Sequence, residues 1–165
     1  TGAAGQLGQH LILKKPSRIN TEEIELFLTT RTQLDLSNEL VCRELIFKNN
    51  PDWIINWGAY TAVDKAETEK EFANLVNGRG PYFLAKYLNE TGGRLLQIST
   101  DFVFDGKNNE AYEINHPLNP INVISIDKLV KDILADTIKD LDNLLILAPN
   151  GILIGDNLSL SMISY

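Results

Sequence analysis

Three glycines in the first ten residues, TGAAGQLGQH, constrain the fold more than any other feature of the chain. Gly2, Gly5 and Gly8 form a G-x-x-G-x-x-G run, and in dinucleotide-binding folds a run of this type joins the first strand to the first helix. The glycines there permit a tight turn, close approach of the backbone to a pyrophosphate, and close packing of helix on strand. A helix over 6–14 would point its N-terminal N–H groups at the phosphates. A flexible N-terminal loop is the alternative that the glycines alone leave open.

Strand-like and helix-like segments alternate along the rest of the chain, which is typical of a parallel sheet covered by helices. Strands are predicted over 24–30, 53–58, 94–99 and 143–148, and helices over 6–14, 37–50, 68–89 and 121–140. Within the third of these helices, Pro81 should produce a kink or a junction between two helices. We therefore predict one α/β domain over residues 1–165, a Rossmann-like doubly wound parallel sheet. Only Thr1 precedes Gly2, so the first strand is expected to be missing.

Charge and cysteine content indicate which partners and which cellular compartment to expect. The net charge is −7 at pH 7 and the pI about 4.8, and without a basic tract nucleic acid is not an expected partner. No apolar run reaches the ~18 residues of a membrane-spanning helix, so no membrane partner is expected. The single cysteine, Cys42, has no internal disulfide partner, which favours a reducing, cytoplasmic location. No cluster of metal-ligating residues stands out, so no metal is expected.

Three further motifs identify a family. NWGAYTAVDKAE (56–67) and STDFVFDG (99–106) each follow a predicted strand, and PLNPINVISIDK (117–128) opens a predicted helix. Together with the glycine run, they resemble the dTDP-4-dehydrorhamnose reductases of the extended short-chain dehydrogenase/reductase superfamily. The resemblance covers residues 1 to about 140. Other nucleotide-sugar reductases, epimerases and dehydratases of the superfamily are the alternatives.

The resemblance implies a reaction. The family reduces the C4 keto group of a dTDP-linked deoxysugar with hydride from NADPH or NADH, in the biosynthesis of dTDP-L-rhamnose. The resemblance implies that Thr100 polarises the carbonyl, and it places Thr100 and Asp101 against the substrate. The family's proton donor is a Tyr four residues before a Lys that lowers its pKa and binds the nicotinamide ribose. Here Lys128 is present, but Ile124 stands at the Tyr position.

The departure at Ile124 leaves the catalytic assignment open. Isoleucine has no proton to give, and neither Tyr60 nor Tyr112 stands at helical spacing from Lys128. Lys128 without its tyrosine is either a ribose ligand or a solvated lysine on a helix face. Thr100 could also simply close its strand with a local turn.

The same resemblance implies a set of cofactor contacts. The pyrophosphate turn would comprise Gly2, Gly5, Gln6, Leu7 and Gly8. Asp35 and Leu36 would lie by the adenine, although Asp35 could simply start a helix.

A second set of contacts lies farther along the chain. Gly58, Ala59 and Tyr60 would back the cofactor, although the family usually has alanine where Trp57 stands. Arg31, directly after the strand predicted over 24–30, favours NADPH because an arginine can pair with a 2′-phosphate. The alternative is a solvated side chain.

Family members continue into a smaller C-terminal substrate domain, which we expect this chain to lack. Together with Ile124, this suggests a partial or degenerate reductase. The competing interpretation is a non-catalytic dinucleotide-binding relative, as in the regulatory β subunit of methionine adenosyltransferase. The sequence leaves open whether the protein forms a homodimer.

Overall fold

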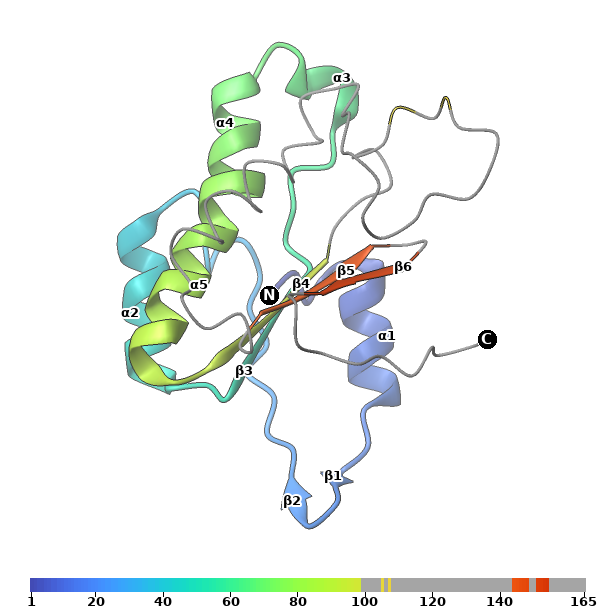
Figure 1. The fold of residues 1–165 in the computed structure, drawn as a ribbon, viewed down its shortest axis with the longest axis vertical. Helices are drawn as coiled ribbons and strands as arrows, with labels where there is room; N and C mark the ends of the chain where they lie inside the picture. The colour runs from blue at the N-terminus through green and yellow to red at the C-terminus, as the bar shows by residue number, and fades with distance from the viewer. Residues whose placement is uncertain (99–104, 106, 108–143, 149–150, 155–165) are drawn as a thin grey trace.

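The computed structural model describes residues 1–98, 105 and 107 and the strands within 144–154 (Figure 1). Its centre is a four-stranded sheet in the order β3-β4-β5-β6. These strands are β3 (Trp53–Asn56), β4 (Arg94–Ile98), β5 (Leu144–Ala148) and β6 (Gly151–Ile154). β3, β4 and β5 are parallel, and β6 joins β5 antiparallel. The predicted α/β architecture with a parallel sheet is confirmed, and β6 is an addition that the sequence did not indicate.

Helices lie on both sides of this sheet. They are α1 (Gln6–Lys14), α2 (Glu39–Asn49), α3 (Val63–Ala66), α4 (Lys70–Asn74), a π-helical turn η1 (Leu75–Arg79) and α5 (Gly80–Thr91). Figure 1 shows α2, α4 and α5 on one side and α1 on the other. Across the described residues, none of these helices has the length and apolarity that crossing a membrane would require.

The long helix predicted over 68–89 is divided as Pro81 indicated. η1 ends at Arg79, and Pro81 lies in the first turn of α5. Proline has no N–H to donate, and its ring clashes with the carbonyl four residues earlier, so the preceding turn must widen. The wider π-helical spacing of η1 meets this requirement.

The predicted strand over 24–30 is wrong. The residues before it form a short hairpin instead, β1 (Arg18–Ile19) with β2 (Glu22–Glu23). The segment itself hydrogen-bonds to other parts of the backbone at its ends, where Ile24 N donates to Ser17 O at 3.0 Å and Ala3 N donates to Thr29 O at 3.1 Å. β3 is the edge of the described sheet. An apolar run without a neighbouring strand has no ladder to join, so its pattern alone does not make it a strand.

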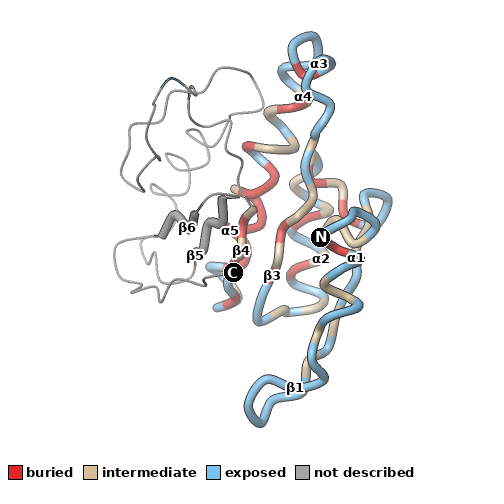
Figure 2. Tube along the Cα trace, turned by 90° about the vertical axis from the view of Figure 1, so that its right-hand side faces the viewer, coloured by how far each residue is buried: buried red, intermediate tan, exposed pale blue. Residues whose placement is uncertain are grey.

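The hydrophobic core lies between the sheet and the α2–α5 pair. Ile46 of α2, Leu84 and Leu88 of α5, and Leu95 of β4 are almost completely buried. Figure 2 shows buried stretches along α5, β3 and β4, while the β1 hairpin is exposed. This core packs against β3 and β4, and β3 leads directly into the turn at Trp57 and Gly58 that the glycine run contacts.

Candidate cofactor site

Gly2 forms the sharpest part of the glycine run. Its φ of +63° is a conformation that side chains rarely adopt. A Cβ at this position would lie 2.8 Å from the carbonyl carbon of Trp57 and 2.9 Å from the nitrogen of Gly58. The run therefore passes directly against the turn that follows β3, and only glycine fits there.

Gly8 lets this turn fold back onto α1. A Cβ at Gly8 would lie 2.6 Å from the carbonyl oxygen of Gly2 and 2.8 Å from the Cα of Ala3. Gly5 N donates to Gly2 O at 2.9 Å and closes the turn. We call Gly2, Gly5, Gly8 and Gly58 the glycine cradle.

The N-terminus of α1 suits an anion. Gly5 is its N-cap and supplies no side-chain hydrogen bond, and the first turn contains no acidic residue. Its first N–H groups therefore have no capping side chain, and the helix dipole is positive at this end. Gln6 and Leu7 of this turn are exposed. A pyrophosphate group fits this combination of close backbone and uncapped N–H groups.

A buried polar network joins the cradle to the ends of β3 and β4. Asn56 Oδ1 accepts hydrogen bonds from Thr1 Oγ1 at 2.5 Å and from Gly58 N at 3.3 Å. Asn56 Nδ2 donates to Gln97 Oε1 at 2.7 Å, and Gln97 Nε2 donates to Ile98 O at 2.7 Å. The network fixes the cradle relative to the carboxyl end of β4.

Tyr60 and Arg31 lie at a second edge of the cradle. Phe72 of α4 is between them: the Arg31 guanidinium carbon is 5.4 Å from the Phe72 ring centroid, and the Tyr60 ring is 5.7 Å from it. The Tyr60 hydroxyl donates to Glu69 Oε2 at 2.8 Å, which is the main reason that the pKa of Tyr60 is raised. Tyr60 and Arg31, 29 positions apart in the sequence, thus meet at one ring.

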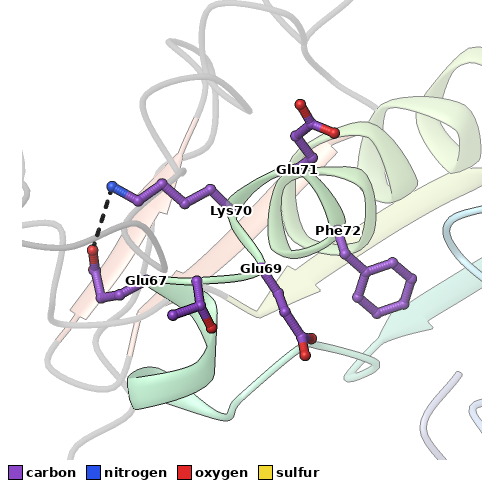
Figure 3. A pocket seen from close by; sticks show the side chains of 6 residues that line it. Glu67, Glu69, Lys70, Glu71 and Phe72 are labelled. Carbon is purple, nitrogen blue, oxygen red and sulfur yellow. Dashed lines mark ion pairs between the residues drawn. The ribbon is translucent and has the colours of Figure 1, made fainter.

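An open hollow lies beside α4 and shares Glu69 and Phe72 with these contacts. It has a volume of about 610 Å³ and is lined by residues 67–72. Figure 3 shows Glu67 and Lys70 paired on one side of the helix, at 3.6 Å, with the Phe72 ring on the other. Three of its six lining residues are glutamates, so this hollow does not suit a phosphate group.

Asp35 and Leu36 have structural contacts of their own. Asp35 Oδ1 accepts hydrogen bonds from Ser37 Oγ at 2.7 Å and Ser37 N at 3.0 Å, and the hydroxyl bond is the main cause of the lowered Asp35 pKa. Leu36 is buried, and a Cβ at Gly58 or Gly80 would lie 2.9 Å or 2.8 Å from its side chain. Leu36 therefore packs directly against Gly58 of the cradle.

The family model for the RmlD substrate binding domain matches residues 1–133. The dTDP-4-dehydrorhamnose reductase of Streptomyces griseus is 34% identical over 142 residues, which cover 83% of this chain and 45% of that protein. The chain belongs to the dTDP-4-dehydrorhamnose reductase family. The same enzyme of Salmonella typhimurium is 41% identical over 95 residues, covering 58% of this chain and 32% of that protein. The chain thus spans less than half the length of these curated relatives.

Solved structures of the family share this fold. The reductase of Bacillus anthracis, in complex with NADP, superposes with a TM-score of 0.77 and 30% identity, covering 89% of this chain and 50% of that one. The Clostridium acetobutylicum reductase gives a TM-score of 0.78, also at 30% identity and with the same coverage. The Rossmann-like architecture predicted from the sequence is therefore the family's own.

Membership of the family does not place the catalytic candidates. Thr100, Asp101, Ile124 and Lys128 lie outside the described residues. The cofactor candidates before residue 61 are all described. Contacts join the glycine cradle to Leu36, and Phe72 joins Arg31 to Tyr60, with Asp35 close enough to Arg31 to interact electrostatically. Within the described ranges, no group of three or more His, Cys, Asp or Glu side chains could hold a metal.

Sequence reasoning missed three residues of this site. Asn56 and Gln97 carried a signal, because each is a polar residue that directly follows two aliphatic residues in its strand. Phe72 carried none, because an aromatic residue in an amphipathic helix usually belongs to the core.

Proposed function

We propose that this chain supplies the NADPH-binding part of a dTDP-4-dehydrorhamnose reductase, which reduces the 4-keto group of a dTDP-linked deoxysugar. The observation that carries the proposal is the glycine cradle beside the uncapped N-terminus of α1. Because a Cβ at Gly2 or Gly8 would meet backbone atoms at less than 3 Å, the run can turn this tightly only with glycine there, and the turn leaves Gly5 exposed at the start of α1. The NADP bound to the Bacillus anthracis relative supports the choice of cofactor.

Each described candidate has a role in holding the cofactor. Backbone N–H groups of Gly5, Gln6 and Leu7 bind the pyrophosphate at the start of α1. The turn from Gly58 through Ala59 to Tyr60 backs the cofactor, and Asp35 and Leu36 flank the adenine. Arg31 pairs with the 2′-phosphate, so NADPH binds more tightly than NADH.

The bound nicotinamide supplies the hydride. Thr100 donates a hydrogen bond to the carbonyl oxygen, where negative charge develops, and Asp101 contacts the sugar. Lys128 binds the ribose and orients it. Ile124 supplies no proton at the position where the family has its tyrosine, so we expect slow turnover.

Ile124 also favours a second candidate function, that of a non-catalytic relative that binds the dinucleotide as a structural or regulatory ligand. The two functions share the cradle and differ in turnover. We further propose a cytoplasmic location, in keeping with the single buried thiol of Cys42. A homodimer is the assembly that we propose for either function, with no nucleic-acid or membrane partner.

The test is a calorimetric titration of the protein, at its natural length, with NADPH. Gly5→Ala is the informative variant, because Gly5 has a φ of −74° and a Cβ would meet only Gly2 O, at 3.3 Å. The fold should tolerate the methyl group, but it would stand where the pyrophosphate approaches. We expect an affinity at least about tenfold lower, equivalent to one lost hydrogen bond to a charged group.

The matched control is Gly92→Ala, at the C-cap of α5, where φ is +80° and no atom lies within 4 Å of a Cβ. It should lower stability without changing the NADPH affinity, the reverse of Gly5→Ala. Wild-type protein that binds neither NADPH nor NADH would contradict the proposal. So would equal affinity of the wild type and Gly5→Ala.

A further inference from the structure

Three side chains from separate segments stack at the edge of the cradle. Arg31 follows the 24–30 segment, Phe72 belongs to α4, and Tyr60 belongs to the turn after β3. The Arg31 guanidinium carbon lies 5.4 Å from the Phe72 ring centroid, within the range of a cation–π contact. The Phe72 and Tyr60 rings meet edge to face, at 5.7 Å and 84°. We call these residues the Arg31–Phe72–Tyr60 stack.

Hydrogen bonds fix the position of Tyr60 within this stack. Tyr60 N donates to Asn77 Oδ1 at 2.8 Å, and Asn77 Nδ2 donates to Tyr60 O at 3.0 Å, so both backbone groups of Tyr60 are fixed to η1. The Tyr60 hydroxyl donates to Glu69 Oε2 at 2.8 Å. Phe72 therefore packs against a ring whose position is set at both ends.

The stack joins the two segments that flank the cradle. On one side, Ala3 N donates to Thr29 O at 3.1 Å, which places the residues leading to Arg31 beside the glycine run. On the other side, Gly2 contacts Gly58, two residues before Tyr60. The guanidinium is thus held at the rim of the cradle rather than on a distant surface.

We propose that Phe72 is a specificity-determining positioning residue, whose ring holds the Arg31 guanidinium where it meets the 2′-phosphate of NADPH. The inference rests on the proposed function and extends it to a residue outside the family motifs. An exposed arginine samples many rotamers, and ordering it on binding costs free energy. A guanidinium already held over a ring loses less of this freedom when it binds the phosphate.

The charges around Arg31 support this role. In the part of the chain that the structure describes, Arg31 forms no ion pair within 4.0 Å. The carboxylate of Glu69 accepts the hydroxyl of Tyr60, and that of Asp35 accepts the hydroxyl and N–H of Ser37. Arg31 can therefore pair with an incoming phosphate without first breaking a salt bridge.

The experiment measures dissociation constants for NADPH and NADH on the natural-length protein and compares their ratio among variants. Phe72→Leu keeps an apolar side chain but removes the ring, and it should lower the preference for NADPH about two- to fivefold, as expected for an exposed cation–π contact. Phe72→Tyr keeps the ring and should keep the preference. Arg31→Ala should lower the preference further, and adding Phe72→Leu to it should cause no additional loss.

Phe47→Leu is the matched control, because Arg43 lies over the Phe47 ring at 5.1 Å on α2, away from the cradle. It should leave the ratio unchanged. A ratio unchanged by Phe72→Leu, or affinities for both nucleotides lowered equally, would overturn the inference and leave the proposed function standing. A wild-type protein that binds neither nucleotide would instead overturn the proposed function, and the inference with it.

Discussion

Asn56 and Gln97 face each other across the register of β3 and β4, and Asn56 Nδ2 donates to Gln97 Oε1 at 2.7 Å. Both side chains are buried, at 0% and 7% exposure, and each follows two aliphatic residues in its strand. Their remaining groups are engaged by Thr1, Gly58 and the carbonyl of Ile98. A buried amide pair satisfied in this way specifies register as well as stability, because a shifted strand would leave both side chains unpaired.

Breaking this pair on one side should therefore be costly. Gln97→Leu leaves Asn56 Nδ2 without its partner in a buried site, and we expect the free energy of unfolding to fall by about 1–3 kcal/mol. The Asn56→Leu/Gln97→Leu double variant should lose less than the sum of the single losses. Urea denaturation measures the free energies of unfolding of Gln97→Leu, Asn56→Leu and the double variant. The exposed Gln9→Leu serves as the control, and strict additivity would argue against a coupled pair.

Local patterns explain most of the fold that could be predicted. α1, α2, β3, β4 and β5 follow from helical or strand periodicity within their own residues, and the joint near Pro81 follows from its missing N–H. The strand over 24–30 failed because strand formation depends on a neighbour, and none lies beside it in the described sheet. β3 also ends at Asn56 rather than at residue 58, because Trp57 and Gly58 leave the sheet to meet Gly2.

The candidate site, like the fold, has a part that the sequence predicts and a part that it does not. The glycine run is predictable because its function depends on backbone conformation encoded by consecutive residues. The contact of Phe72 with Arg31 depends instead on where α4 passes, and α4 is placed by the whole β3–α5 connection. Sequence spacing contains no information about that approach.

Gly2 and Gly92 offer a paired test of the cradle's packing. Both have positive φ, +63° and +80°, so alanine at either position introduces backbone strain of about 1–2 kcal/mol. Only Gly2 also has neighbours, with Trp57 and Gly58 backbone atoms within 3 Å of a Cβ. We expect Gly2→Ala to lower the free energy of unfolding more than Gly92→Ala by at least about 1 kcal/mol. Equal losses in urea denaturation would mean that the cradle can open without cost.

Cys42 should be chemically inert in the folded protein. Its side chain is fully buried, and this burial raises its pKa from 9.0 to about 12. A shift of this size leaves far less of the reactive thiolate at pH 8. Labelling with a disulfide reagent should be at least about a hundredfold slower in buffer than in urea. Fast labelling in buffer, with the native circular dichroism retained, would contradict the packing of α2 against α5.

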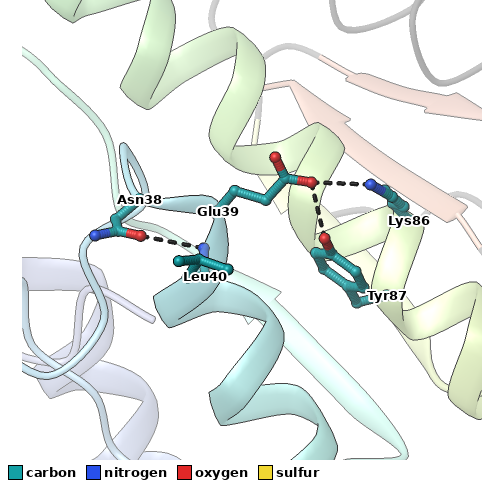
Figure 4. A network of polar contacts seen from close by, with 5 residues as sticks. All are labelled: Asn38, Glu39, Leu40, Lys86 and Tyr87. Carbon is teal, nitrogen blue, oxygen red and sulfur yellow. Dashed lines mark hydrogen bonds and ion pairs between the residues drawn. The ribbon is translucent and has the colours of Figure 1, made fainter.

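Glu39 gives the stability a dependence on pH. Its Oε1 accepts from Lys86 Nζ at 2.9 Å and from Tyr87 OH at 2.8 Å, joining α2 to α5 (Figure 4). The Lys86 bond is the main cause of the lowered pKa of Glu39. Since the folded pKa lies below the unfolded value near 4.5, the stabilisation is present above pH 4.5 and is lost as pH falls through the folded pKa.

Glu39→Gln should therefore lower the free energy of unfolding at pH 7 by about 0.5–1 kcal/mol, a small value because the pair is partly exposed. The difference from wild type should shrink as the pH falls below 4.5 and through the folded pKa of Glu39. Glu90→Gln, at an exposed position of the α5 helix that carries Lys86 and Tyr87, is the control and should change little across this pH range. A deficit that does not shrink as the pH falls would assign the effect to packing rather than charge.

The residue at position 124 decides between the two proposed functions. The family resemblance puts the proton-donating tyrosine there, and a positioned general acid typically contributes about 10²–10⁴-fold to the rate. In the natural-length protein, Ile124→Tyr should therefore raise kcat for the dTDP-linked 4-keto sugar with NADPH and change KM little. Steady-state kinetics of the wild type and the variant measure both quantities.

Ile124→Phe separates the proton from the size of the side chain. A pocket shaped around isoleucine could reject any aromatic ring by overpacking, and the phenylalanine variant would then lose nucleotide affinity or stability as the tyrosine variant does. If Ile124→Tyr gains activity and Ile124→Phe does not, the phenol supplies the proton that the wild type lacks. A wild type as fast as its tyrosine variant would mean that another residue is the acid. Normal NADPH binding with no turnover by either protein would favour the non-catalytic function, since the two functions share the cradle and differ in turnover.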